Sequence, residues 1–147
     1  MSIFRILFSL LTVFSPLTFN VAAAQDFGNE VVTIINNSVP QAAISKNGLR
    51  AIFSMRLRNW YDNLPITVFV LPDADPLHRQ FSKEILNVFP NQMRRAWNRL
   101  VFSGSGQAPI TVANSQEMLA RVKSTPGAIG YLPRQDITKE VRVLQIE

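Results

Sequence analysis

The residues best suited to proton transfer lie in the short segment LPDADPLH, which contains Asp73, Asp75 and His78. Two neighbouring carboxylates can serve as general acid and general base when their protonation states differ. The same carboxylates also precede a helical pattern, where they would cap the helix and interact favourably with its dipole. We favour the capping role, with both carboxylates exposed. His78 could touch a ligand at this loop, but we expect it to be a surface residue.

A second candidate site is the run SGSG, in which Ser103, Gly104 and Ser105 could form a nest of backbone N–H groups and hydroxyls for an anion. Arg99 lies just before this run. The alternative is a plain solvated loop. The run does not match a glycine-rich nucleotide motif.

Composition excludes several kinds of chemistry. The 147 residues include no cysteine and one histidine. A disulfide, a thiolate nucleophile and a metal site built from several histidines are therefore excluded, and we expect no metal site and no cofactor. The sequence shows no serine–histidine–aspartate constellation, so we predict that the protein is not an enzyme. The net charge of +5 and the pI near 10.2 suit an anionic partner without choosing among anions.

Two segments combine arginines with aromatic residues, a pattern compatible with nucleic acid or with an acidic partner. These segments are RLRNWY, with Arg56, Arg58, Trp60 and Tyr61, and RRAWNR, with Arg94, Arg95, Trp97 and Arg99. Trp97 falls on the apolar face of its helix, so we assign it to the core. The arginines form either a solvated face or a docking surface.

Residues 1–24 have the pattern of a secretory signal peptide. One cation, Arg5, precedes an apolar run, and Ala22 to Ala24 provide small residues before Gln25. The alternative is a membrane anchor, but Pro16 interrupts the run. We therefore predict cleavage after Ala24, export to the periplasm, and a folded domain over residues 25–147. Export argues against a nucleic-acid partner.

Strand and helix patterns alternate along that domain, which predicts an α/β fold with a mixed or parallel sheet. Apolar, β-branched runs at 30–37, 65–72, 128–132 and 141–146 predict strands. Four helices are predicted, and the first follows Ser45. The second spans 73–89, with Leu77, Phe81 and Ile85 facing inward. The third begins at Pro90, with Met93, Trp97, Leu100 and Val101 facing inward, and the fourth follows Asn114, with Met118, Leu119 and Val122 facing inward.

The stretch STPGAIGYLP needs two glycines for different reasons. Gly127 can end the preceding helix in the left-handed conformation. Gly130, inside the following strand, predicts the close approach of another backbone or of a ligand.

Three of these segments together resemble phosphate ABC-transporter substrate-binding proteins. They are LRAIFSMRLRNW, ITVFVLPDADPLHRQFSKEIL and VANSQEMLARVKSTPGAIGYLP, which follow the order and spacing of that family over roughly residues 30–133. The most telling part runs from Pro126 to Tyr131. The resemblance implies a single, shortened lobe of a type II periplasmic-binding-protein-like fold, with a mixed sheet flanked by helices.

The resemblance also implies where a ligand would bind. The family carries an Arg-Ser-Asp-Gly-Ser-Gly-Thr run at a strand-to-helix junction, and only Asp73 matches it, as the residue that accepts a proton from hydrogen phosphate. Leu71 stands in place of the arginine, and Pro72 and Asp75 stand in place of hydroxyl residues.

Two hypotheses follow. The first is an exported, non-enzymatic solute-binding-like protein for phosphate or a related small anion, linked to ABC-type uptake. It would bind the anion weakly alone or with a second lobe supplied by a homodimer, and an ABC permease would be its partner. The second is an envelope protein-interaction module that kept the lobe and lost the ligand site.

Overall fold

A computed structural model describes residues 28–147, and the predicted signal peptide over residues 1–24 lies outside this range. The helices are α1 (Lys46–Phe53), α2 (Pro76–Gln80), α3 (Pro90–Phe102) and α4 (Ser115–Ser124), with a π-helical turn, η1 (Phe81–Ile85), and a 3₁₀ turn, η2 (Arg134–Asp136). The strands are β1 (Val31–Asn36), β2 (Ala43–Ile44), β3 (Thr67–Val70), β4 (Ile110–Thr111), β5 (Ala128–Pro133), β6 (Val141–Val143) and β7 (Gln145–Ile146).

Five of the strands form one mixed sheet in the order β4-β3-β5-β1-β6. Strand β3 runs parallel to both β4 and β5, whereas β1 runs antiparallel to β5 and β6. The fully buried strand β1 occupies an inner position, as its continuous β-branched run predicts. Strands β2 and β7 pair separately in parallel. The predicted α/β class with a mixed sheet is confirmed.

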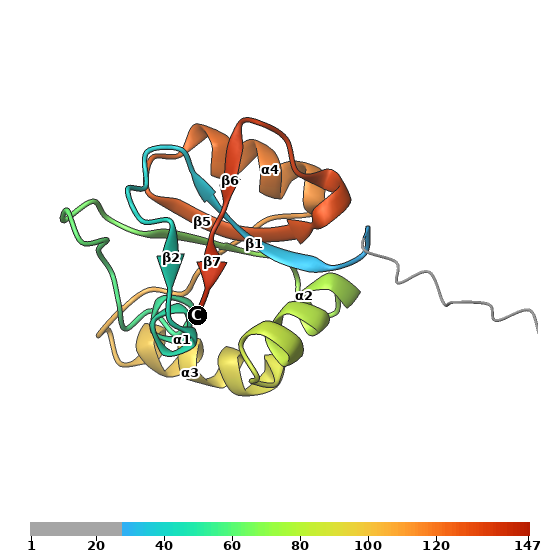
Figure 1. The fold of residues 1–147 in the computed structure, drawn as a ribbon. Coiled ribbons are helices and arrows are strands. Elements are labelled where there is room, and N and C mark those ends of the chain that lie inside the picture. Colours follow the sequence, from blue (N-terminus) through green and yellow to red (C-terminus); the bar gives the residue numbers. More distant parts are fainter. Residues whose placement is uncertain (1–27) are drawn as a thin grey trace, which may run out of the picture.

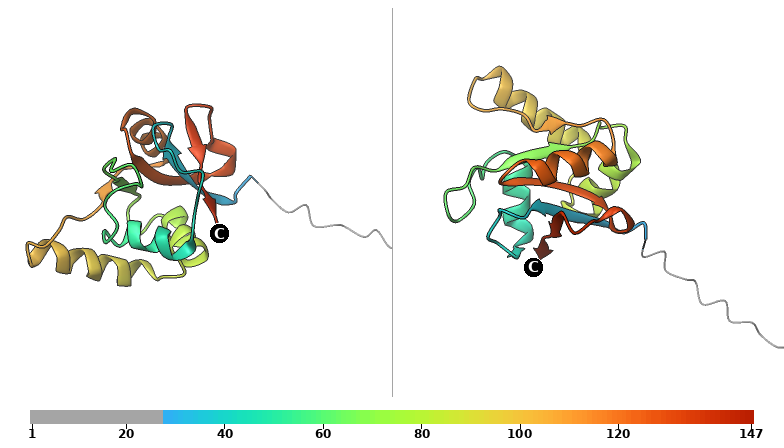
Figure 2. Two further views of the ribbon diagram at one scale, coloured as in Figure 1. Left: turned by 60° about the vertical axis from the view of Figure 1, so that its left-hand side comes forward. Right: turned by 90° about the horizontal axis from the view of Figure 1, so that it is seen from above.

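Helices cover both faces of the sheet (Figure 1). Helix α4 lies on one face, and α1, α2 and α3 lie on the other. The second layer is also visible as a group below the sheet in the left view of Figure 2. In the described part of the chain, no helix is long and apolar enough to cross a membrane.

Successive residues of strand β5 face the two opposite sides of the sheet, and therefore the two helix layers. A Cβ on Gly130 would come within 2.5 Å of the Met118 sulfur of α4. The next side chain, Tyr131, points to the opposite face, where its ring stacks on Phe81 with centroids 4.0 Å apart. Gly130 therefore lets α4 lie close against the sheet, which confirms the predicted close approach.

The helix predicted over 73–89 begins later than expected, and its inward face is rotated relative to the prediction. It begins at Pro76, with Asp75 as its N-cap, and continues as the π turn that ends at Ile85, with Leu86 as the C-cap. Phe81 is fully buried as predicted, and Leu77 and Ile85 are partly buried against the core. Because His78 and Ser82 are also fully buried, the centre of the inward face is rotated by about one residue from the predicted one.

Two further predictions need correction. The last strand, predicted as one run, is divided into β6 and β7, and these strands join different sheets. Val101, predicted to face inward, is 49% exposed because it lies in the last turn of α3, and Phe102 beside it is 87% exposed. Trp97 is fully buried as predicted, and its indole N–H donates to the carbonyl of Phe53 at 2.8 Å.

Candidate functional site

The loop from Leu71 to Asp75 joins the end of β3 to the start of α2. Because β3 is parallel to both of its neighbours, this loop lies at the carboxyl edge of the parallel part of the sheet. Ligands of open α/β sheets bind outside the carboxyl ends of such strands. The topology therefore makes this loop the first place to look for a binding site.

Asp73 in this loop forms a bidentate ion pair with Arg94 of α3. Its two carboxylate oxygens accept from Nε and Nη2 of Arg94 at 2.9 and 2.8 Å. The Arg94 side chain is 34% exposed and that of Asp73 is 39% exposed, so the pair is open to solvent on one side. The hydrogen bond with Arg94 lowers the pKa of Asp73 and raises that of Arg94.

The sequence-based expectation for these carboxylates is half confirmed. Asp75 caps α2, because its Oδ1 accepts from the backbone N–H of Leu77 at 2.8 Å. Asp73 makes the ion pair instead of a cap. Arg94, expected on a solvated face, is held by Asp73 on one side and stacks over the Trp97 ring at 5.0 Å on the other.

A buried tyrosine connects the end of β3 with α2. The hydroxyl oxygen of Tyr131 accepts from the backbone N–H of Leu71 at 2.8 Å and lies 2.5 Å from Nδ1 of His78. Nδ1 is the acceptor available to the phenol hydrogen, so we assign His78 to the tautomer with its proton on Nε2. Burial raises the pKa of Tyr131, which keeps the phenol protonated at neutral pH.

His78 is buried, with 1% of its surface exposed, so the prediction of a surface histidine is wrong. Burial lowers the pKa of His78, although the charge of Asp73 acts in the opposite direction. Its Nε2 lies 3.8 Å from Oδ1 of Asp73 and has no hydrogen-bond partner within residues 28–147. Asp73, His78 and Tyr131 thus stand in sequence from the surface into the core.

This arrangement is suited to binding rather than to nucleophilic attack. The hydroxyl of Tyr131 lies inside the core and is already engaged by two partners. Asp73 and Arg94 are the members of the group that solvent reaches. Residues 28–147 contain no group of three or more potential metal ligands.

The candidate anion loop Ser103–Ser105 follows the C-terminus of α3. The backbone N–H groups of residues 103–106 donate to carbonyls of the last helical turn, at Arg99, Leu100 and Val101. The hydroxyls of Ser103 and Ser105 lie 2.7 Å apart, and the carbonyl of Ser105 accepts from Arg58 at 3.0 Å. The Ser103 hydroxyl also donates to the Leu100 carbonyl at 3.2 Å, so both hydroxyls are engaged and the Arg58 guanidinium is the donor that remains for a ligand. The loop borders a shallow hollow that also includes Gln107.

The structure does not bring the two candidate sites together. Arg94, which holds Asp73, lies within α3, and Ser103 is the C-cap of that helix, nine residues further along the chain and about 14 Å away along the helix axis. Sequence reasoning missed Arg94 and Tyr131 as partners of the loop. The alternation of β5 was the available signal for Tyr131, because it places Tyr131 on the face opposite Gly130.

Three solved structures share this fold at low sequence identity. An ABC-type phosphate transport receptor from Vibrio cholerae matches with a TM-score of 0.59 and 15% identity, over 79% of this chain and 45% of that chain. A phosphate ABC transporter substrate-binding protein from Clostridium perfringens, solved with bound phosphate, matches with a TM-score of 0.65 and 16% identity, over 79% and 44%. PstS from Borrelia burgdorferi gives a TM-score of 0.59 and 17% identity, over 79% and 46%.

The fold and the position of the loop thus define a lobe of the periplasmic-binding-protein type. The family model described as PBP superfamily domain matches residues 17–142, and the chain belongs to this family. No curated protein sequence matches the chain. The chain spans somewhat less than half the length of the solved structures above, so it corresponds to one part of those proteins. The predicted family resemblance and fold class are confirmed.

Proposed function

We propose that the protein is an exported, non-enzymatic solute-binding-like protein that recognises hydrogen phosphate or a related small anion through Asp73 and Arg94. The observation that carries the proposal is the bidentate, solvent-accessible pair of these residues at the carboxyl edge of the sheet. The fold relatives with phosphate in their names support the choice of anion.

The pair would recognise a protonated anion by complementary hydrogen bonds. Nη1 of Arg94 makes no hydrogen bond within residues 28–147 and can donate to an anion oxygen. Asp73, whose pKa is lowered, is ionised at neutral pH and only accepts hydrogen bonds. Hydrogen phosphate carries a proton for that carboxylate, whereas sulfate carries none at neutral pH. We therefore propose selectivity for phosphate over sulfate.

A single lobe leaves one side of such a ligand in water, where electrostatic contacts are screened. We therefore propose that a homodimer or an ABC permease completes the site. The N-terminal pattern supports export to the periplasm by a cleaved signal peptide. Ser103, Gly104 and Ser105 stay a second candidate anion contact, with Arg58 as their cation.

The test is a titration by calorimetry and thermal shift, in buffer free of phosphate, with sulfate and chloride as controls. The core side chains of the described fold lie between Val31 and Leu144, so a chain that begins at Gln25 keeps that core. We expect a saturable, phosphate-selective stabilisation that Asp73→Asn reduces at least tenfold in affinity. Equal responses to phosphate and sulfate, or none to either at millimolar concentration, would refute the proposal.

The alternative, a protein-interaction module, is favoured by a different observation. Val101 and Phe102 at the end of α3 are 49% and 87% exposed, and Arg95 and Arg99 lie on the same helix. Exposed aromatic and arginine side chains are typical of interface centres. A cross-linked partner that is lost in Phe102→Ser, together with an absent phosphate response, would support this function over the first.

A further inference from the structure

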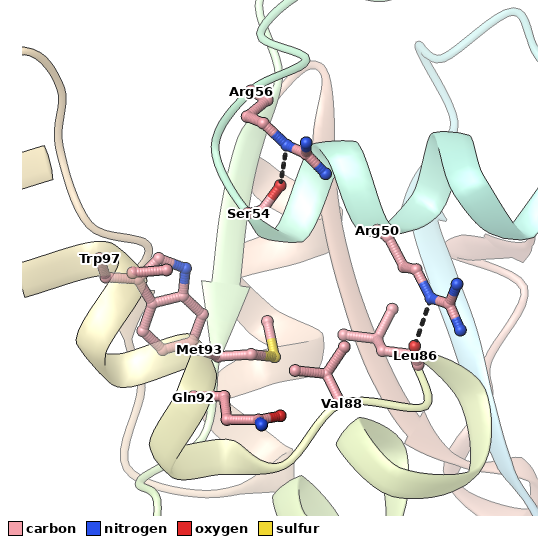
Figure 3. A pocket seen from close by; sticks show the side chains of 9 residues that line it. Arg50, Ser54, Arg56, Leu86, Val88, Gln92, Met93 and Trp97 are labelled. Carbon is pink, nitrogen blue, oxygen red and sulfur yellow. Dashed lines mark hydrogen bonds between the residues drawn. The ribbon is translucent and has the colours of Figure 1, made fainter. Parts of the chain in front are cut away.

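A pocket distinct from the Asp73 loop opens between α1 and α3 (Figure 3). One side is lined by Arg50 of α1 and by Ser54 and Arg56, which follow the end of that helix. Gln92, Met93, Ala96 and Trp97 of α3 line the other, and Leu86 and Val88 close the end that follows η1.

The floor of this pocket is apolar and firmly built. Leu86 and Trp97 are buried to within 1% of their surface, and Met93 to within 6%. Trp97 is fixed by its hydrogen bond to the Phe53 carbonyl, so the indole ring cannot turn away. In Figure 3, Met93, Val88 and Leu86 point toward one another across the centre of the pocket. Such a floor accepts a flat or branched hydrocarbon group.

The rim is positively charged and has no matching anion. Arg50 donates from Nε to the Leu86 carbonyl at 2.5 Å, and Arg56 donates from Nε to the Ser54 hydroxyl at 3.0 Å. These contacts leave the terminal nitrogens of both guanidiniums available. Among residues 28–147, neither arginine forms a salt bridge, and the pocket lining contains no Asp or Glu. Gln92 adds an amide donor at the same mouth.

The volume of the pocket limits the size of the ligand that it can hold. Its volume is about 160 Å³. An apolar protein cavity of about 150 Å³ is known to accept benzene. One aromatic ring therefore fills the floor, and a carboxylate on that ring would reach the arginine rim.

We propose that this pocket is a binding site for a small organic monoanion with a single apolar ring or a branched chain of similar size. The ring packs on Met93, Val88 and Ala96, above the buried Trp97, and the carboxylate accepts from Arg50 and Arg56. This site uses none of the residues proposed above for phosphate, so either site can be present without the other.

Benzoate is the probe, and methionine methyl groups are the reporters. In protein labelled at the methionine ε-methyls, Met93 lies in the pocket, whereas Met118 belongs to the buried side of α4, on the far face of the sheet, and serves as an internal control. We expect a saturable shift of the Met93 and Trp97 indole signals with a Kd of about 1 mM, and no shift of Met118. Acetate and benzyl alcohol, which carry the anion or the ring alone, should each bind at least tenfold more weakly.

Arg56→Gln removes a rim charge from an exposed side chain and should weaken benzoate about tenfold. Arg95→Gln, on the outer side of α3 and outside the pocket lining, is the matched control and should leave the Kd unchanged. Ala96→Leu should fill the pocket and abolish binding. The proposal is overturned by an unchanged Kd in Arg56→Gln, by equal binding of benzyl alcohol and benzoate, or by the absence of saturation at 20 times the expected Kd of about 1 mM.

Discussion

Arg94 of α3 and Asp73 of the β3–α2 loop, 21 positions apart, are joined by two parallel N–H···O hydrogen bonds of 2.9 and 2.8 Å. The pair fixes α3 against the carboxyl edge of the sheet and gives the loop a local cation that its own sequence lacks. Because the carboxylate is 39% exposed, solvent screens the pair, and its role in binding is expected to exceed its role in stability.

A double-mutant cycle with Asp73→Asn and Arg94→Gln measures that stability directly. We expect a coupling free energy of about 0.5–1 kcal/mol in urea unfolding at pH 7, because the geometry is bidentate but partly exposed. The pair Lys123–Glu140, with side chains 42% and 57% exposed, is the control and should give no more than about 0.5 kcal/mol. A coupling above about 3 kcal/mol would mean that the Asp73 pair behaves as a buried one.

The burial of His78 predicts a pH dependence of stability. Its folded pKa lies below the ordinary value of 6.5, so the unfolded chain binds the proton more readily. Above pH 6.5 both states are neutral at this position and stability is flat. As the pH falls below 6.5, the free energy of unfolding should drop by at most about 1.4 kcal/mol per pH unit, until the pH reaches the folded pKa of His78. Urea titrations should show that this slope is lost in His78→Asn.

The hydroxyl of Tyr131 is expected to stabilise the fold through two partners. Tyr131→Phe leaves the Leu71 N–H and His78 Nδ1 buried without a hydrogen bond, at a cost of about 1–3 kcal/mol for each group. Urea unfolding should therefore show a loss of about 2–6 kcal/mol. Tyr61→Phe, at a side chain 88% exposed, is the matched control and should stay within about 0.5 kcal/mol of the wild type. A similar small loss in Tyr131→Phe would contradict the assigned network.

Local rules were sufficient for the starts of two helices. Ser45 and Asn114 cap α1 and α4 as their positions predict, with side chains that accept from Gly48 and Glu117. Helix capping depends on residues within one turn, so a single sequence contains the whole signal. The resemblance carried by residues 126–131 likewise identified the lobe.

The site depended on contacts that no local rule contains. The burial of His78 depends on the angle at which α2 and η1 enter between the sheet and α3, which rotates the inward face by one residue. The choice of Arg94 over Arg95 or Arg99 as the partner of Asp73 depends on how α3 is rotated on its axis. Both rotations are determined by packing between elements. They therefore cannot be predicted from the charge pattern of a single helix.

A comparison of Gly127, in the turn before β5, with Gly104 can separate the cost of backbone strain from the cost of a steric clash. Gly127 and Gly104 have similar positive φ angles, +73° and +69°. A Cβ at Gly104 would meet nothing within 4 Å, whereas a Cβ at Gly127 would lie 2.1 Å from the backbone oxygen of Pro65. Gly104→Ala should therefore cost about 1–2 kcal/mol, the strain of a left-handed residue alone.

Gly127→Ala adds a clash with backbone that cannot rotate aside, and it disturbs the hydrogen bond from the Trp60 indole to the Gly127 carbonyl at 3.0 Å. Overpacking costs of about 1–3 kcal/mol add to the strain, so we expect a total loss of about 2–5 kcal/mol. Urea unfolding of both variants, with near-ultraviolet circular dichroism to follow the tryptophan environment, gives the comparison. Equal losses in the two variants would mean that the segment around Pro65 moves freely and that Gly127 is required for its φ angle alone.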